Sequence, residues 1–461
     1  MSDGTDSQGV RSRELCPCAI LALLLLFSFS TIHQKRFDAA TPVSRLDLLH
    51  ALVDKHSWSI DSYHTNTTDK AVSGGHYYSD KAPGAVALAL PAFAATSIVL
   101  RAIGVEANSQ ASWLATSWMA CVFSQALPAA VGGALLFSWL SQFVARRAAL
   151  ATVLALFLGS LPLPYSTSLF SHAGVIGLLS IAMWAMNLFG LQRSNTRTGN
   201  SKRMVLAGVC AGLALASEFS SGLVVMGFVG YVCVRRQGGV QPFVMGMLPP
   251  LLLIPIYSWL TIRTPFAIPY SYQATFLAMN EGLYAIKMPD FENLWRLLFS
   301  PTRGLVFWTP FLLLAIPGML RLPSTCPGSQ WLFYYIPLLH CLVISGRVWD
   351  WEAGPTLSAR YFAPILPLLA ILCALGVERW PRLGLVLGMY SIGIVTFATL
   401  TDACPGGYLY NPLLQLHLPL FLHGELSPNV GMILGLPPYA SVALYYAIVV
   451  SGMWWLWRRL P

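Results

Sequence analysis

Residues 33–83 read HQKRFDAATPVSRLDLLHALVDKHSWSIDSYHTNTTDKAVSGGHYYSDKAP and form a long polar stretch between two apolar runs. The stretch holds six of the 19 Asp and Glu residues of the chain. These charges stand out because only 10% of the 461 residues are charged and 56% are hydrophobic, whereas an ordinary soluble domain has roughly 25% charged residues. We therefore expect 33–83 to be the loop on which the chemistry of this apolar chain depends.

The rest of the chain consists largely of apolar runs near or above the ~18 residues that a helix needs to cross a bilayer. Backbone groups in lipid must be hydrogen-bonded internally, which a helix achieves. The sequence therefore predicts an all-α, polytopic membrane protein, a single transmembrane domain over 1–461 with an extracytoplasmic loop at 33–83. No small-residue cleavage pattern follows the first apolar run, 18–32, so we interpret it as an uncleaved helix and not a signal peptide.

Lys and Arg residues cluster at the ends of the apolar runs, so the net charge of +9 indicates orientation and not nucleic-acid binding. We expect these clusters and both termini to be cytoplasmic. The predicted cytoplasmic clusters are 146–147, 193–203, 235–236, Arg321, 378–382 and 457–459. The segments expected together on the opposite face are 33–83, 165–172, Glu218, 263–303, 347–360 and 401–436.

The number of crossings stays open. Roughly thirteen apolar stretches have the ~20-residue length of a spanning helix, whereas two cytoplasmic termini require an even number. Either 84–101 does not cross completely, or 113–143 is two short helices broken near Pro128. Helices lying in the interface plane are expected at 45–53 and within 289–303, because apolar and polar residues alternate there at helical spacing.

The acids of the polar loop are candidates for a general base, which accepts a proton from a hydroxyl as its oxygen attacks an electrophilic carbon. For any one of them, a solvated loop position without a role is the alternative. Asp61, Asp69 and Asp80 stand out, because aromatic and turn residues surround them and would fix their geometry.

Two motifs resemble signatures of the GT-C glycosyltransferase superfamily. The stretch YSDKAP, 78–83, resembles its acidic-Lys-Pro-Pro signature with one Pro replaced by Ala, and VWDWEAGPTLSARYFAPILP, 348–367, resembles a second signature of bacterial branches. Weaker similarities are LFSHAG at 169–174, SEFS at 217–220, SPTRGLVFWTP at 300–310 and NPL at 411–413. In this order the motifs resemble dolichyl-phosphate-mannose-protein mannosyltransferase-like and aminoarabinose-transferase-like enzymes, which use polyprenyl-phosphate-linked sugars.

The resemblance implies a glycosyltransferase that moves a sugar from a polyprenyl-phosphate donor to a hydroxyl of a lipid, glycan or protein, on the outer face of a bacterial inner membrane. Such enzymes place an acidic residue, often an Asp-Glu pair, at the start of the loop, where this chain has Thr41 and Pro42. Asp38 is close but displaced. We therefore favour Asp61 as the catalytic base, with Asp38 and Asp80 as alternatives.

The departing phosphate gains negative charge, so cationic side chains are expected beside it. Arg360, Lys81 and Arg303 are the candidates, since a guanidinium grips phosphate oxygens through two N–H groups and an ammonium supplies a point charge. For each of them, a side chain that only reaches out to the membrane interface is the alternative. Further residues expected to line the cavity are Asp69, Tyr78, His172, Glu218, Trp349, Trp351 and Tyr361.

No metal or other cofactor is predicted, because the loop acids have no fixed ligand spacing. Branches of the superfamily differ in their need for a divalent cation, so a cation stays an alternative. Two rival functions are also open. A transporter or flippase of a lipid-linked glycan would place ionisable residues near the bilayer midplane, whereas here they crowd the outer end; a non-catalytic relative would explain the missing Asp-Glu pair.

Overall fold

The computed structural model of the chain describes residues 5–35, 37–190, 197–235, 239–280, 286–347, 351–406 and 409–460, without the side chains of 5–16 and 197–200. Over these residues the regular elements are helices, apart from one pair of short strands, and loops and turns connect them. Within the same ranges, six helices are long and apolar enough to cross a membrane, by length and composition. The predicted all-α membrane fold is therefore confirmed.

Helices of very unequal length make up most of the described chain. The α-helices are α1 (Thr5–Thr31), α2 (Ala40–Asp54), α3 (Gly84–Ala102), α4 (Gln110–Cys121), α5 (Leu127–Leu140), α6 (Arg146–Leu158), α7 (Pro162–Ser166), α8 (His172–Met186), α9 (Arg197–Ser217), α10 (Gly222–Arg235), α11 (Val240–Ile262), α12 (Phe291–Phe299), α13 (Leu305–Trp308), α14 (Ala315–Thr325), α15 (Ile336–Ser345), α16 (Leu366–Arg379), α17 (Pro381–Asp402), α18 (Leu418–Leu422), α19 (Val430–Ile433) and α20 (Pro438–Arg459). The short 3-10 and π turns are η1 (Val122–Ala126), η2 (Phe219–Ser221), η4 (Pro269–Tyr272), η5 (Leu277–Asn280), η6 (Pro310–Leu314), η7 (Trp331–Tyr335), η9 (Arg360–Ile365) and η10 (Leu413–His417). The strands are β1 (Lys70–Ser73) and β2 (His76–Ser79).

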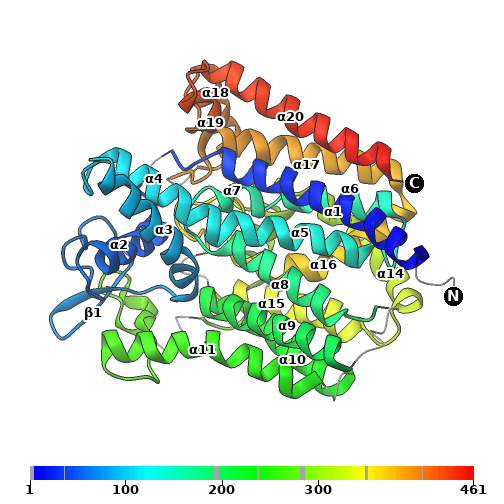
Figure 1. Cartoon of the computed structure of the whole chain (residues 1–461), viewed down its shortest axis with the longest axis horizontal. Coiled ribbons are helices and arrows are strands. Elements are labelled where there is room, and N and C mark those ends of the chain that lie inside the picture. The colour runs from blue at the N-terminus through cyan, green and yellow to red at the C-terminus, as the bar shows by residue number, and fades with distance from the viewer. Residues whose placement is uncertain are drawn as a thin grey trace.

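The long helices lie side by side along the length of the molecule, as Figure 1 shows. α8 lies between α5 and α9, and α16 packs against α6 and α14. The apolar segment that ends in α16 is 83% buried, whereas those of α11 and α20 are only 28% buried. α16 is therefore a central helix, while α11 and α20 expose apolar surface suited to lipid.

α1 begins and α20 ends at the same end of this bundle, which we call the terminal end (Figure 1). Basic clusters predicted to share a face meet there. Arg147 donates to the carbonyl oxygen of Leu460 at 2.9 Å, and Arg321 lies 3.4 Å from the carboxylate of Glu378. The structure thus groups these clusters together, and their cytoplasmic location stays a prediction.

The opposite end, which we call the loop end, carries α2, β1, α18 and α19 (Figure 1). Segments predicted to share a face also meet there. The His33 amide donates to the carbonyl oxygen of Pro428 at 2.9 Å, and the Gln34 amide donates to that of Thr167 at 3.0 Å. Three of the polar segments singled out in the sequence therefore lie against one another.

The run 113–143 is not broken near Pro128, because α4 continues through η1 into α5. α3 instead keeps both ends near the loop end. Its first residue, Gly84, lies so close to the end of α9 that a Cβ atom would come within 2.6 Å of the Ser217 nitrogen. In its last turn, Arg101 forms an ion pair with Asp54 at the end of α2. This arrangement favours the alternative in which 84–101 does not cross completely.

The two expected interfacial helices differ in burial. α12 matches the expectation for 289–303, since Phe291 and Trp295 are 76% and 65% exposed beside its charged residues. The segment 45–53 is helical, in α2, but it does not have the exposed polar side expected of a helix in the interface plane. Leu46, Asp47 and Leu49 are all fully buried, because α3 and β2 cover α2.

The hairpin of β1 and β2 was not predicted from the sequence. Its strands pair antiparallel, and the turn between them is Gly74–Gly75. Both glycines have positive φ, +57° and +81°, which is the geometry of the tight turns that join twisted strands. The hairpin occupies the part of the loop between α2 and α3.

Candidate functional site

A cavity of about 230 Å³ opens at the loop end of the bundle. Its walls come from the start and the end of the 33–83 loop, from the segments around 170 and 218, and from two later loops. The described lining residues are Asp38, Ala39, Ala40, Thr41, Arg45, Thr68, Asp69, Lys81, Phe170, His172, Glu218, Tyr270, Phe276, Met279, Ala353, Gly354, Pro355, Arg360 and Tyr361.

The first turn of α2 brings the start of the loop to the cavity. Pro42 is tolerated there, because the first turn of a helix leaves its N–H groups without intrahelical partners. Asp38, just before α2, is exposed and lines the cavity. Thr41 donates its hydroxyl to Asp69 Oδ2 at 2.6 Å, which ties the start of the loop to the segment before β1.

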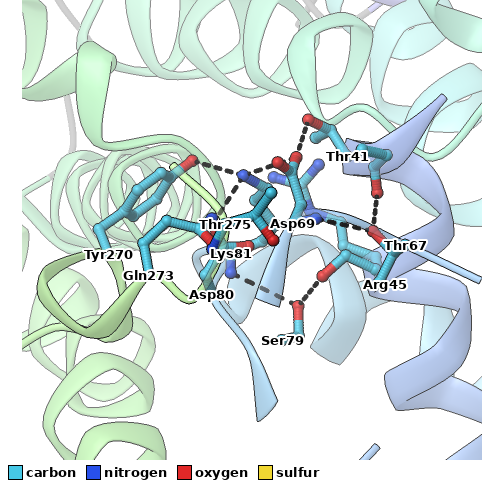
Figure 2. Close-up of polar contacts among 12 residues, drawn as sticks. Thr41, Arg45, Thr67, Asp69, Ser79, Asp80, Lys81, Tyr270, Gln273 and Thr275 are labelled. Carbon is cyan, nitrogen blue, oxygen red and sulfur yellow. Dashed lines mark hydrogen bonds and ion pairs between the residues drawn. The ribbon is translucent and has the colours of Figure 1, made fainter. Parts of the chain in front are cut away.

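Lys81, Asp69 and Asp80 form a buried cluster that we call the Lys81 trio. Lys81 Nζ lies 2.8 Å from Asp69 Oδ2 and 3.1 Å from Asp80 Oδ2. The segment after α11 closes the cluster, as Figure 2 shows: Lys81 donates to the Tyr270 hydroxyl at 3.4 Å, and Gln273 Nε2 donates to Asp80 Oδ2 at 2.7 Å.

Burial and charge act in opposite directions within the trio. Burial is the largest single effect on Asp69 and raises its pKa, but the charge and hydrogen bond of Lys81, the Thr41 hydroxyl and the charge of Arg360 together bring this pKa below its ordinary value. Burial raises the pKa of Asp80 to about 6, against the effect of Lys81. Burial lowers the pKa of Lys81, but the two acids outweigh this effect and raise it above its ordinary value. Lys81 therefore stays charged, and its charge is balanced inside the trio.

Arg45 is a lining residue that the sequence-based interpretation missed. It is buried in α2, and its Nη1 donates to the carbonyl oxygens of Leu169 and Phe170 at 3.1 and 2.9 Å. Its Nη2 donates to the Ser171 hydroxyl at 3.3 Å. The signal in the sequence is the charge of Arg45 next to several leucines. Helical spacing alone assigns this charge to the polar side of a surface helix, so the spacing does not indicate that Arg45 is buried.

Arg360 reaches the same wall from η9. Its guanidinium lies over the Phe170 ring at 4.7 Å from the ring centre, and its Nη2 donates to the Tyr361 hydroxyl at 3.4 Å. Stacking on an aromatic face holds a guanidinium in place and does not remove its positive charge. Arg45 and Arg360 thus bring two guanidiniums to the cavity from distant parts of the chain.

Glu218 and His172 complete this side of the cavity. Glu218 accepts a hydrogen bond from the Ser171 hydroxyl at 3.0 Å, and its carboxylate lies 3.8 Å from His172 Nδ1. Ser171 also accepts from Arg45, so it links the acid to one of the two guanidiniums.

The predicted site residues fall into two groups. Those that line the cavity are Asp38, Asp69, Lys81, His172, Glu218, Arg360 and Tyr361. Those that do not are Asp61, Asp80, Arg303, Tyr78 and Trp351. Trp349 lies outside the described residues.

Asp61, the base favoured from the sequence, lies on the exposed side of the loop. Its Oδ2 is 2.6 Å from His76 Nδ1, and its Oδ1 accepts the Tyr77 amide at 2.7 Å. Its turn context does fix its geometry, but it does so against the β1–β2 hairpin. The preference for Asp61 as the base is therefore not supported by its position.

Asp80 and Arg303 are both buried behind the cavity wall. Asp80 is enclosed by Lys81 and Gln273, which leaves it no access to an acceptor. Arg303 donates to the carbonyl oxygens of Glu352 and Gly354 at 3.1 and 3.0 Å. Its position corrects the expectation that it contacts the phosphate.

Two predicted aromatic lining residues also lie elsewhere. Tyr78 is in β2, paired with Ala71 of β1. Trp351 packs under the guanidinium of Arg296, 5.6 Å from its ring centre. Neither side chain contributes to the cavity lining.

Within the described part of the chain, no three His, Cys, Asp or Glu side chains gather as a metal site would require. Of the acids in the cavity, Asp69 faces Lys81 and Glu218 faces His172. A reaction that needs a divalent cation stays an untested alternative.

No family model matches the chain, and no curated protein matches it. Among solved structures, ArnT from Cupriavidus metallidurans in the apo state is 15% identical, with a TM-score of 0.41, over 99% of this chain and 76% of that one. ArnT bound to undecaprenyl phosphate is 15% identical, with a TM-score of 0.40, over 96% and 76%. Arabinosyltransferase EmbB from Mycobacterium smegmatis is 12% identical, with a TM-score of 0.43, over 95% and 40%. ArnT and EmbB are members of the GT-C superfamily.

Proposed function

We propose that the chain is a membrane glycosyltransferase of the GT-C class, which moves a sugar from a polyprenyl-phosphate donor to a hydroxyl acceptor on the outer face of the membrane. One observation carries this proposal: a single cavity joins an exposed acid, Asp38, to two guanidiniums, Arg45 and Arg360. An acid for the acceptor and cations for the leaving phosphate are the two functions that the reaction needs.

In this reaction the acceptor oxygen attacks the anomeric carbon of the sugar as the bond from that carbon to the phosphate oxygen breaks. Asp38 takes the proton of the acceptor hydroxyl. The polyprenyl phosphate leaves with the bonding electrons, and Arg45 and Arg360 bind its oxygens. Direct displacement of this kind inverts the configuration at the anomeric carbon.

The surroundings of each acid support Asp38 as the base. Asp69 also lines the cavity, but Lys81 and Thr41 hold its carboxylate, and its lowered pKa weakens it as a proton acceptor. Asp38 is exposed at the cavity, so an acceptor can reach it. Lys81 contributes less to phosphate binding than the guanidiniums, since its charge is already balanced by two acids.

A matched pair of variants tests the assignment. Asp38→Asn should lower the rate of sugar transfer by about 10²–10⁴-fold, the usual contribution of a general base. Asp61→Asn, which changes an acid of the same loop outside the cavity, should leave the rate within about twofold. Both rates are measured in proteoliposomes as consumption of a polyprenyl-phosphate sugar, with insertion checked for each variant.

Two outcomes would count against this proposal. Full transfer by Asp38→Asn would remove the assigned base. Movement of a labelled lipid-linked glycan across the bilayer, without consumption of the donor, would favour the transporter alternative.

A further inference from the structure

The segment 352–358 forms one wall of the cavity and leads directly to Arg360. Ala353, Gly354 and Pro355 line the cavity. The backbone of this segment is strained, because Ala353 and Ser358 have φ values of +58° and +61°. Residues other than glycine adopt this left-handed region at a cost, and they stay there only where their surroundings hold them.

Arg303 supplies such a restraint from behind the wall. Besides the bonds from its Nε to Glu352 and from its Nη2 to Gly354, its Nη1 donates to the carbonyl oxygen of Thr302 at 3.2 Å. All three guanidinium nitrogens thus bond to backbone carbonyls. Two of these carbonyls belong to the strained segment, so Arg303 spans the turn at its start.

A second side chain holds the other part of the same segment. Tyr165, buried in α7, donates its hydroxyl to the carbonyl oxygen of Leu357 at 2.8 Å. Inside the segment, the Thr356 hydroxyl donates to the Glu352 carbonyl oxygen at 3.2 Å. The turn is therefore held at Glu352 and Gly354, on either side of Ala353, and at Leu357, just before Ser358.

We propose that Arg303 is a positioning residue: by pinning 352–358, it sets the direction in which Arg360 presents its guanidinium to the cavity. A guanidinium on a fixed segment binds an anion without the cost of ordering a loop at the moment of binding. This assignment rests on the proposed function, because it concerns the binding of the leaving polyprenyl phosphate by Arg360.

The test is a double-mutant cycle on the full chain in lipid nanodiscs, with undecaprenyl phosphate as the probe. Arg360→Met should weaken its binding by about tenfold or more, as expected for the loss of a charge-assisted contact. Arg303→Met should weaken binding by a similar factor, and the double variant should bind no worse than Arg360→Met alone. Such non-additivity shows that Arg303 acts through Arg360.

Arg321→Met is the matched control, since Arg321 forms an exposed ion pair at the terminal end. It should leave affinity unchanged and combine additively with Arg360→Met. Should Arg303→Met fail to fold, Tyr165→Phe replaces it. That variant removes one hydroxyl, and it should weaken binding by about fivefold, the value of one hydrogen bond.

A measurement without ligand separates the two proposals. Hydrogen exchange at the backbone amides of 357–363 should speed up in Arg303→Met and stay unchanged in Arg321→Met. Unchanged exchange in Arg303→Met, or additive effects in the cycle, would overturn the positioning role. The proposed function would be overturned instead if the wild-type chain did not bind undecaprenyl phosphate while hydrogen exchange at 357–363 still became faster in Arg303→Met.

Discussion

Two acid–base contacts in the same loop have nearly the same length and opposite surroundings. Lys81 lies 2.8 Å from Asp69, and their side chains are 4% and 8% exposed. His76 lies 2.6 Å from Asp61, and their side chains are 60% and 42% exposed. Removing one partner of a buried pair leaves an uncompensated charge, whereas an exposed pair contributes little. We therefore expect burial, and not distance, to decide how much each contact contributes to the free energy of unfolding.

The largest effect is expected from Lys81→Met. This change leaves Asp69 and Asp80 buried without their cation, and we expect it to lower the free energy of unfolding by ~3–5 kcal/mol. Chemical unfolding in detergent measures the loss. Lys70→Met, in the hairpin of the same loop, is the control and should stay within ~1 kcal/mol. If Lys81→Met and Lys70→Met lowered the free energy of unfolding equally, the distinction between buried and exposed charges in this loop would be contradicted.

A smaller effect is expected from pH. Asp80 has a pKa of about 6 in the folded chain, against about 3.9 when unfolded. Its contribution to stability is therefore present below about pH 4 and lost as the pH rises through 6. Asp69, with a lowered pKa, acts in the opposite sense: its contribution is present above about pH 4 and lost on further acidification.

Asp80→Asn isolates the first of these two contributions. In unfolding curves measured between about pH 2 and pH 7, the variant should lose the decline in stability that Asp80 causes above about pH 4 and keep the loss that Asp69 causes below it. If the wild-type chain and Asp80→Asn showed the same dependence of stability on pH, Asp80 would not hold its proton between about pH 4 and pH 6 in the folded state.

The smallest effect is expected from Asp61→Asn. The exposed contact with His76 should contribute no more than ~1 kcal/mol, and added salt should weaken it further. Unfolding at low and at high salt measures both quantities. A loss of several kcal/mol would mean that the exposed contact between Asp61 and His76 stabilises the fold as much as the Lys81 trio does, which would contradict the comparison.

The sequence was sufficient to predict the fold class and the gathering of polar segments at one end. Both predictions depend on properties that are local in the chain, namely the length of the apolar runs and the placing of charges between them. The burial of α2 was not predictable in this way, because α3 and β2 cover its polar side, and the pattern of 45–53 does not reveal that cover.

The same reason accounts for the errors at the candidate site. Asp38 and Asp61 are both loop acids, and only contacts with distant segments separate the one at the cavity from the one on the hairpin. Arg45 was overlooked because its acceptors lie near residue 170. Arg303 was assigned to the phosphate because its charge is evident in the sequence. The backbone carbonyls that accept its hydrogen bonds can be identified only in the structure.

The contact between Gln273 and Asp80 joins residues 193 positions apart. During translation, at about 5–20 residues per second, the second partner follows the first by on the order of ten seconds or more. Throughout that interval Asp80 lacks its Gln273 partner, and we expect Asp69, Asp80 and Lys81 to stay hydrated. A ribosome-stalled chain that ends after α11 should therefore leave these three side chains open to reagents that the finished protein excludes.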